Sequence, residues 1–295
     1  MMNYQEFIQA VIQEIEKLGI KKEALRKEVS LKNNGQKKIG LIFVREEAQI
    51  CPVVYMESFY ARYCSARETV DVLSREIYLL LQKNEEKREN PIAFENFSDW
   101  DKIKNRIFGK LVNADRNGEF LNTSPHRKVL DLALVYYVKM GETDTDGMVT
   151  VMIHDQHMKL WNRNEEDLYQ TAMKNMETED MIFQNILEIL GTSLPVPDMD
   201  ENQMYVLSTK NKIFGAVELL NRPAINQIAE RLHSDLIILP SSIHELMILP
   251  QKDLILSEVA KTVKEINGEC VSAEEYLSDH VYEFKRSTGS INIAA

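Results

Sequence analysis

The sequence predicts an α+β fold in which a largely antiparallel mixed sheet packs against helices, with a smaller N-terminal α/β subdomain before it. The first observation is a pair of apolar runs, Leu236–Leu239 and Leu246–Leu249, which a polar segment beginning at Pro240 joins as a hairpin. Both runs are apolar on both faces, which predicts central strands that are covered from two sides. The second observation is that helix and strand patterns follow one another irregularly, with hairpins, instead of repeating as βαβ units.

The N-terminal region begins with a helical pattern and continues with a hairpin. Apolar residues recur at helical spacing over residues 3–18, and Gly19 occupies a position where helices commonly end. Asn33-Asn-Gly35 lies between two apolar stretches and predicts a tight turn, because Asn-Gly readily adopts positive φ. A second helix is predicted over Thr69–Leu81.

A change in composition then marks the expected domain boundary. Nine consecutive polar or charged residues run from Gln82 to Asn90, and Pro91 follows them. Such a run is typical of a linker or of a solvated helix end, and the proline favours the linker. We therefore expect a helix–hairpin–helix subdomain over residues 1–95 and a larger α+β domain over residues 96–295.

Strands and helices of the larger domain are predicted from their apolar patterns. The predicted strands are Ile107–Val112, Val129–Val138, Met148–Ile153 and Met204–Leu207. The predicted helices are a short one through Arg106 with Ser98 as its N-cap, Glu165–Met176, Met181–Leu190, a segment from about Gly215, Pro223–Leu232 and Leu254–Ile266. Asn164 and Asp167 have the spacing of a capping pair before the second of these helices. Residues 287–295 fit either an edge strand or a loose tail.

The composition is that of a soluble globular protein and argues against several classes of function. The net charge of −11 disfavours a basic surface for nucleic acid or an anionic membrane. No apolar run approaches the roughly 20 residues that cross a bilayer, and the first residues lack the pattern of a signal peptide. Cys51, Cys64 and Cys270 are far apart and match no metal or redox spacing, so we expect a cytoplasmic protein.

Two motifs carry a family resemblance. They are Thr123-Ser-Pro-His-Arg127 with Leu130-Asp-Leu-Ala-Leu134, and Leu239-Pro-Ser-Ser-Ile-His-Glu245. Together with the strand–helix pattern from Met148 to Met176, they resemble a bacterial family of unknown function. The resemblance extends more weakly into the N-terminal region. That family has no assigned activity, so the resemblance implies no catalytic role for any residue.

Two histidines are candidate metal ligands. His154 and His157 follow a predicted strand, and side chains three residues apart on a helical turn can meet one metal ion. A metal site needs at least a third ligand, and no neighbour in the sequence obviously supplies one. Asp155 fits equally well as the cap of a helical turn that runs to Trp161, and we favour this structural interpretation.

A hydroxyl, an imidazole and a carboxylate occur together in the predicted hairpin. Ser241, Ser242, His244 and Glu245 supply them. Nucleophilic catalysis needs these groups in a spatial relay, whereas neighbours on a hairpin point to opposite faces. The serines after Pro240 are ordinary turn residues. His244 and Glu245 remain candidate catalytic residues, with turn formation favoured.

The third candidate group precedes a predicted strand. His126 and Arg127 could bind an anion, or either could pair with Asp131, which is predicted to lie inside the apolar strand. A buried carboxylate has to be paired or hydrogen-bonded. Because alternation places Arg127 and Asp131 on the same face of the strand, we favour a structural pair over a binding role.

These observations favour binding over catalysis. The chain lacks the common phosphate-binding, dinucleotide-binding and zinc-protease motifs, and its 11 glycines leave little material for a phosphate-cradling loop. We predict a non-catalytic binding or protein-interaction module without a cofactor, whose partner is a protein or peptide rather than nucleic acid or a membrane. The alternative is a hydrolase in which His154 and His157 bind a metal ion and Glu245 or Asp131 serves as third ligand or base. That alternative requires at least three candidate side chains to meet in one cleft.

Overall fold

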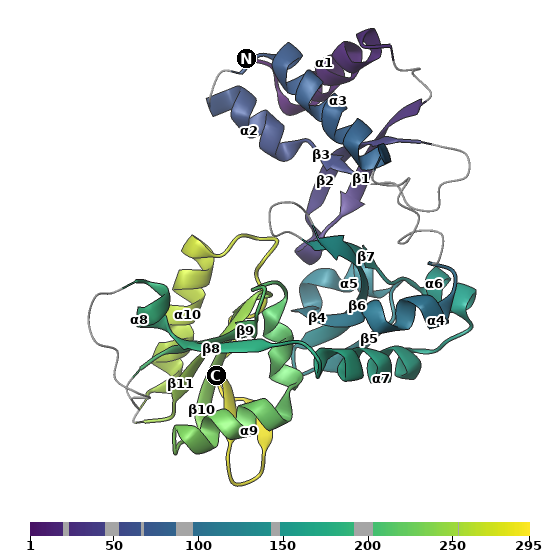
Figure 1. Cartoon of the computed structure of the whole chain (residues 1–295). Helices are drawn as coiled ribbons and strands as arrows, with labels where there is room; N and C mark the ends of the chain where they lie inside the picture. Colours follow the sequence, from purple (N-terminus) through teal and green to yellow (C-terminus); the bar gives the residue numbers. More distant parts are fainter. Residues whose placement is uncertain are drawn as a thin grey trace. The chain divides into compact units, whose positions relative to one another are not determined.

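A computed structural model describes residues 1–19, 24–44, 53–65, 68–86, 97–142, 148–191, 203–252 and 254–295 (Figure 1). The chain forms two compact units, one of Met1–Lys32 with Gln36–Phe97 and the other of Asn33–Gly35 with Ser98–Ala295. Every pairing between described strands is antiparallel, and helices pack on the sheets, so the predicted α+β fold is confirmed. The expected boundary near residue 95 lies outside the described residues.

The first unit packs helices on one face of a small sheet. Its elements are α1 (Tyr4–Lys17), β1 (Leu25–Leu31), β2 (Lys37–Phe43), β3 (Val54–Tyr55), α2 (Glu57–Ser65) and α3 (Val70–Glu86). The apolar stripes of α1 and α3 meet over Leu41 and Met56, which are fully buried. Asn34 and Gly35, between β1 and β2, both have positive φ, as the Asn-Gly pair predicts.

The second helix of this region extends beyond its predicted end at Leu81. The polar run that begins at Gln82 is helical at its start, because α3 continues to Glu86. Gln82 and Lys83 are exposed, so this part of the helix needs no apolar partner and its sequence carries no amphipathic signal. Pro91, which favoured a linker, lies outside the described residues.

The second unit contains two antiparallel sheets, the first of which is the β4–β7 sheet. Its strands are β4 (Ile107–Asn113), β5 (His126–Val129), β6 (Leu132–Glu142) and β7 (Met148–Met152). β6 pairs with β4 along one edge and with β5 and β7 along the other. Its neighbouring helical segments are α4 (Trp100–Ile103), η4 (Lys104–Arg106), η5 (Asp115–Asn117), α5 (Gly118–Leu121), α6 (Asp155–Trp161) and α7 (Glu165–Met176). Asn164 and Asp167 form the predicted capping box of α7.

The predicted strand Val129–Val138 is wrong at its beginning. The chain reverses at Leu130 and Asp131, so that β5 and β6 form a hairpin in which Val129 pairs with Leu132. Leu130 has φ of 56°, the left-handed conformation that tight hairpin turns require. Asp131 therefore lies in a turn and not inside a buried strand.

The second sheet of this unit is the β8–β13 sheet. Its strands are β8 (Met181–Asn185), β9 (Tyr205–Thr209), β10 (Leu236–Ser242), β11 (Glu245–Pro250), β12 (Tyr282–Lys285) and β13 (Ser290–Ile293), in the order β13-β12-β10-β11-β9-β8. The associated helical segments are α8 (Ile186–Ile189), η6 (Gly215–Leu220), α9 (Arg222–Arg231) and α10 (Leu256–Cys270). Val263 of α10 packs on Ile237 and Leu239. The predicted β10–β11 hairpin is confirmed, and β10 is buried between β11 and β12.

Two further element predictions need correction, and the structure decides the alternative left open for residues 287–295. The predicted helix Met181–Leu190 is wrong, because Met181–Asn185 pairs with β9 as β8 and the helix begins only at Ile186. Pairing with a strand distant in sequence outweighs local helix preference here. The predicted cap Ser98 is replaced by Asp99. Residues 287–295 contain the edge strand β13. None of the described helices is long and apolar enough to cross a bilayer.

Candidate functional site

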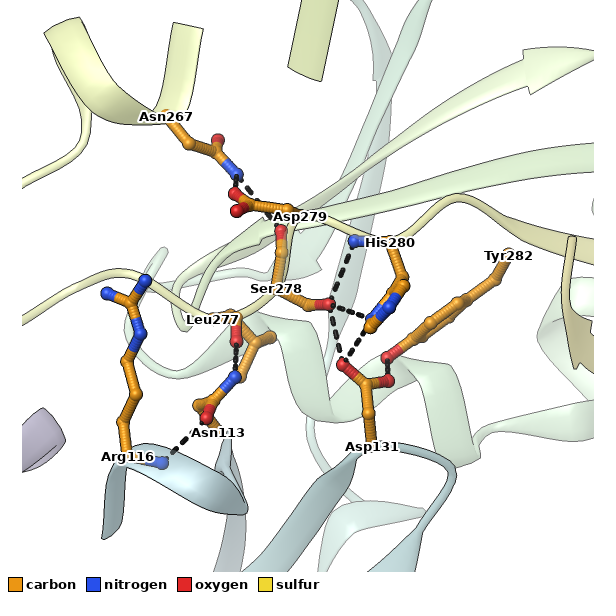
Figure 2. A network of polar contacts seen from close by, with 9 residues as sticks. All are labelled: Asn113, Arg116, Asp131, Asn267, Leu277, Ser278, Asp279, His280 and Tyr282. Carbon is orange, nitrogen blue, oxygen red and sulfur yellow. Dashed lines mark hydrogen bonds and ion pairs between the residues drawn. The ribbon is translucent and has the colours of Figure 1, made fainter. Parts of the chain in front are cut away.

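Asp131 lies at the centre of a network of polar contacts in the second unit (Figure 2). Ser278 Oγ donates to Asp131 Oδ2 at 2.7 Å, His280 Nδ1 lies 2.9 Å from the same oxygen, and the Tyr282 hydroxyl donates to Oδ1. Burial acts to raise the pKa of Asp131, but the contacts with Tyr282, Ser278 and His280 outweigh it and hold the pKa below its usual value. The expected partner Arg127 takes no part in this network.

Serine, histidine and aspartate are the residue types of a nucleophilic relay, but Ser278, His280 and Asp131 have a different arrangement. In a relay, the serine and the carboxylate contact opposite nitrogens of the imidazole. Here Ser278 Oγ and His280 Nδ1 both contact Asp131 Oδ2 and lie 3.3 Å apart. Ser278 is 1% exposed, which keeps its hydroxyl away from a substrate. The network holds the β5–β6 turn against the segment before β12.

Backbone contacts extend this network on both sides. Asn113 Nδ2 donates to the Leu277 carbonyl at 2.9 Å, and Asn267 Nδ2 donates to the Ser278 carbonyl at 3.0 Å (Figure 2). Both asparagines are buried. Because buried backbone carbonyls are costly to leave unpaired, these contacts place the network among the structural features of the unit.

Arg127 pairs with the start of α7 and not with Asp131. Its Nη2 lies 2.7 Å from Glu165 Oε2 and 2.5 Å from Glu166 Oε2, and its guanidinium stacks on Tyr169 at 3.7 Å from the ring centre. The expected Arg127–Asp131 pair is therefore wrong. The turn at Asp131 carries the aspartate out of the strand on which Arg127 lies, so alternation along one strand does not relate the two side chains.

The histidines of the β5 and α6 region gather around Ser124. Ser124 Oγ lies 2.9 Å from His154 Nδ1, and His126 Nδ1 lies 2.9 Å from the Ser124 carbonyl. His154 is the N-cap of α6, in place of the predicted Asp155, and its backbone N–H donates to His157 Nδ1 at 3.1 Å. Burial, together with His154, lowers the pKa of His157 to about 4.

A metal site on these histidines receives no support from their contacts. The rings of His154 and His157 have centres 5.8 Å apart, and the Nδ1 atom of each ring already has a partner. Within the described ranges, no group of three or more His, Cys, Asp or Glu side chains is placed to hold a metal ion. The contacts of His154 and His157 are therefore those of residues that stabilise the start of α6.

His244 and Glu245 lie in the second sheet, at the β10–β11 turn. His244 Nδ1 accepts the Phe214 N–H at 3.3 Å, and the His244 carbonyl accepts Ser208 Oγ at 2.7 Å. Burial lowers the pKa of His244, which suits a neutral ring that accepts a backbone donor. Glu245 begins β11 opposite Ser242. His244 thus holds the loop that leads from β9 into η6.

That loop forms one wall of a cleft with a cavity volume of about 230 Å³. The cleft lies among the end of β6, the connection from α7 to β8 and the segment after β9. Its lining residues are Tyr137, Lys139, Met148, Thr178, Glu179, Asp180, Thr209, Lys210, Asn211 and Ile213. Lys210 Nζ lies 2.8 Å from Asp180 Oδ2, and Lys139 Nζ lies 3.7 Å from Glu179 Oε1. The outer cleft therefore presents both signs of charge.

An inner chamber of about 10 Å³ adjoins this cleft. The two cavities share Tyr137, Glu179, Thr209 and Ile213, and the chamber is further lined by Phe108, Gly109, Met176, Phe214, Val217 and Glu218. Its volume is close to that of a single water-sized group. Phe214 precedes η6 with φ of 57°, so that the chain turns sharply and η6 brings Glu218 to the chamber wall.

Two buried polar side chains of this chamber, Tyr137 and Glu218, each have an oxygen atom that forms no hydrogen bond with the described protein. Tyr137 and Glu218 are each 4% exposed. Glu218 Oε2 accepts Asn221 Nδ2 at 2.9 Å, whereas Glu218 Oε1 and the Tyr137 hydroxyl have no hydrogen-bond partner in the part of the chain that the structure describes. Burial and the neighbouring Glu179 raise the pKa of both Tyr137 and Glu218. Perturbed titratable groups in a cleft are typical of binding sites.

A protein-family model of a family of unknown function, DUF5688, matches residues 4–286. The chain belongs to this family. No curated protein and no solved structure matches the chain. Membership of DUF5688 agrees with the resemblance predicted from the two motifs, and it assigns no activity to the cleft or to the Asp131 network.

Sequence reasoning missed the residues that matter most in this DUF5688 protein. Tyr137 was included in an apolar strand, and Ser278, His280 and Tyr282 follow a segment with a weak secondary-structure signal. Glu218 did carry a signal, because it is the charged residue in the apolar stretch Gly215–Leu220. A single carboxylate on an otherwise buried turn has to find a partner or line a cavity.

Proposed function

We propose that this DUF5688 protein is a non-catalytic binding module of the bacterial cytoplasm, and that the cleft beside Tyr137 and Glu218 receives a polar side chain of a peptide or protein partner. The observation that carries the proposal is the pair of buried groups with unused bonding capacity beside a cavity. Side-chain oxygens that lie beside a cavity without a described protein partner can accept or donate hydrogen bonds to a ligand group there.

The hydrolase alternative has weaker support. His126 and His154 contact Ser124, Arg127 contacts Glu165 and Glu166, Asp131 is bonded within its own network, and His244 holds the β9–η6 loop. Each of these five side chains thus has a local structural contact, and they belong to separate parts of the second unit. Catalysis needs its acid, base and nucleophile around one reacting atom.

A peptide selection on the full chain tests the proposed function. Peptides from a displayed random library are selected on the protein and then measured against Asn211→Trp, which fills the outer cleft from an exposed position. Lys128→Trp, on the exposed side of β5, is the matched control. We expect the selected peptides to lose binding to Asn211→Trp and to keep it with Lys128→Trp. Equal binding to both variants contradicts the proposal, and so does turnover in a hydrolase screen that a change at His154 or His244 abolishes.

A further inference from the structure

The charges of the inner chamber differ from those of the outer cleft. Lys139 and Lys210 line the outer cleft, whereas the charged residues that line the chamber, within the described ranges, are Glu179 and Glu218. Glu218 has no cation beside it there, and its described hydrogen-bond partner is Asn221. A cation that enters the chamber therefore meets Glu218, together with Glu179, whose Oε1 lies 3.7 Å from Lys139 Nζ.

Aromatic rings surround the same space. Phe108 and Tyr137 stack with ring centres 6.1 Å apart, and Phe214 meets Tyr137 edge-on at 5.3 Å. All three rings line the chamber. Aromatic faces attract ammonium groups through the quadrupole of the ring, most strongly where water is excluded. Phe214 already stacks on His244 and has Lys110 Nζ 4.6 Å from its centre, so the rings of Phe108 and Tyr137 are the ones left to a ligand cation.

Size and polarity restrict the ligand further. A chamber of about 10 Å³ takes one water-sized group, and an –NH₃⁺ group has that size. Its three N–H donors match the free Glu218 Oε1, the Glu179 carboxylate and the Tyr137 oxygen. The outer cleft has apolar surface from Met148 and Ile213, along which a carbon chain can lie.

We propose that the chamber binds a primary ammonium group at the end of a flexible carbon chain, such as a lysine side chain of a partner or a small alkylamine. This inference rests on the proposed function, because it names the chemistry of the group that the cleft receives. Burial raises the pKa of Glu218 while the chamber holds no cation. An entering ammonium group favours the ionised form, so binding is coupled to release of a proton from Glu218.

Calorimetric titration of the full chain with pentylamine tests the ammonium requirement. Pentan-1-ol and pentanoate have similar chains with a neutral or an anionic end. We expect pentylamine to bind with a Kd on the order of 1 mM and the other two not to bind measurably. Binding of pentanoate without pentylamine overturns the ammonium inference, while the proposed function of the cleft survives. Absence of binding by all three probes overturns the inference as well.

Three variants test the residues. Glu218→Gln keeps the shape and removes the charge, so pentylamine should bind about tenfold more weakly. Tyr137→Phe removes the free hydroxyl and should weaken binding about fivefold. Glu119→Gln, at an exposed position of α5, is the matched control and should bind as the unaltered protein does. Circular dichroism of each variant confirms that it is folded. Unchanged binding to a folded Glu218→Gln contradicts the inference.

Proton release on binding can be measured, and it would not occur if Glu218 only stabilised the fold. Alkylamines stay protonated as the pH rises through the raised pKa of Glu218 and its carboxyl ionises, so binding should strengthen as the pH rises. The binding heat should depend on the ionisation heat of the buffer, and this dependence should vanish in Glu218→Gln. A buffer-independent heat with the unaltered protein contradicts the proton coupling.

The source of the ammonium group is resolved by a blocked peptide. Acetyl-Gly-Lys-Gly-amide presents a lysine side chain without a terminal charge, and the corresponding arginine peptide presents a cation too large for the chamber. We expect the lysine peptide to bind and to compete with pentylamine, and the arginine peptide not to compete. If pentylamine binds and the lysine peptide does not, the ammonium chemistry holds and the peptide partner of the proposed function is wrong.

Discussion

Two carboxyl groups of the second unit, the half-buried Asp131 and the buried Glu218, have opposite surroundings. Both oxygens of Asp131 have partners, and its pKa is lowered. Glu218 has one described donor, Asn221, and its pKa is raised. Each stands near a tyrosine, but the Tyr282 hydroxyl bonds to Asp131, while the Tyr137 hydroxyl has no partner in the described chain. A carboxyl whose oxygens both bond to the protein stabilises the fold, whereas one with an oxygen left beside a cavity can bond to a ligand.

The largest effect should come from removing the carboxyl of the satisfied network. In Asp131→Ala, the donors of Ser278, Tyr282 and His280 lose their acceptor, and we expect the free energy of unfolding to fall by about 3 kcal/mol at pH 7. Urea unfolding followed by tryptophan fluorescence measures it. Because the pKa of Asp131 is lowered from 3.8, the contribution is complete above that pH and is lost as the pH falls through the folded pKa. A loss of less than about 0.5 kcal/mol would contradict the conclusion that Asp131, unlike Glu218, stabilises the fold.

The two tyrosines offer a matched pair of substitutions. Tyr282→Phe removes a donor from the ionised Asp131 and should destabilise the protein by about 2 kcal/mol. Tyr137→Phe removes a hydroxyl that has no partner and should change stability by less than about 0.5 kcal/mol. Thermal unfolding of the two variants under the same conditions gives the comparison directly. Equal losses would mean that the Tyr137 hydroxyl has a structural role after all.

The next substitution, Glu218→Gln, should raise the free energy of unfolding instead of lowering it. The folded pKa of Glu218 is raised, so the folded state binds this proton more tightly than the unfolded state does. Stability is therefore lost as the pH rises from the unfolded value of 4.5 through the folded pKa, and the penalty remains above it. Glu218→Gln lacks the penalty and should be more stable than the unaltered protein by about 1 kcal/mol at pH 8. The difference should vanish near pH 4, and a variant that is less stable at pH 8 contradicts this account.

The last prediction concerns the boundary between the two units. Asp131 and Glu218 should both lie in the larger fragment that remains after cleavage at this boundary. We propose that the boundary lies within residues 82–96, where polar residues follow the core of α3. Brief proteolysis of the full chain should cleave first in that segment and leave the larger fragment resistant. Mass spectrometry of the early fragments locates the site. First cleavage beyond residue 98 would place the boundary elsewhere.

Local rules predicted those elements whose signals lie within a few residues of one another. The capping pair Asn164 and Asp167, the Asn34-Gly35 turn and the β10–β11 hairpin follow from short-range pattern alone. The helix predicted over Met181–Leu190 failed because its first half pairs with β9, and no local rule anticipates a partner strand. The prediction that Asp131 lies inside a strand is wrong for a related reason. The chain turns at Leu130 and Asp131, within the strand that the apolar pattern implied.

The residues of the candidate site could not be predicted from the sequence, for a different reason. Histidines, arginine and carboxylates were selected for their chemistry, and in the structure those residues are engaged in caps, ion pairs and turns. Tyr137 and Glu218 sit in apolar runs, where a pattern predicts core packing. What distinguishes them is a cavity and the absence of a bonding partner within the described chain, and both depend on tertiary structure.

The Asp131 network also has a consequence for how the protein folds. Ser278 lies 147 residues after Asp131 in the sequence, and Tyr282 lies 151 residues after it. Contacts of such sequence separation form slowly, because a long loop must close before the contact gives any stability. During synthesis, the β5–β6 hairpin leaves the ribosome long before β12, and until then the β10 edge that β12 covers is open to other strands. The second unit therefore reaches its final form only after residue 282 has emerged from the ribosome.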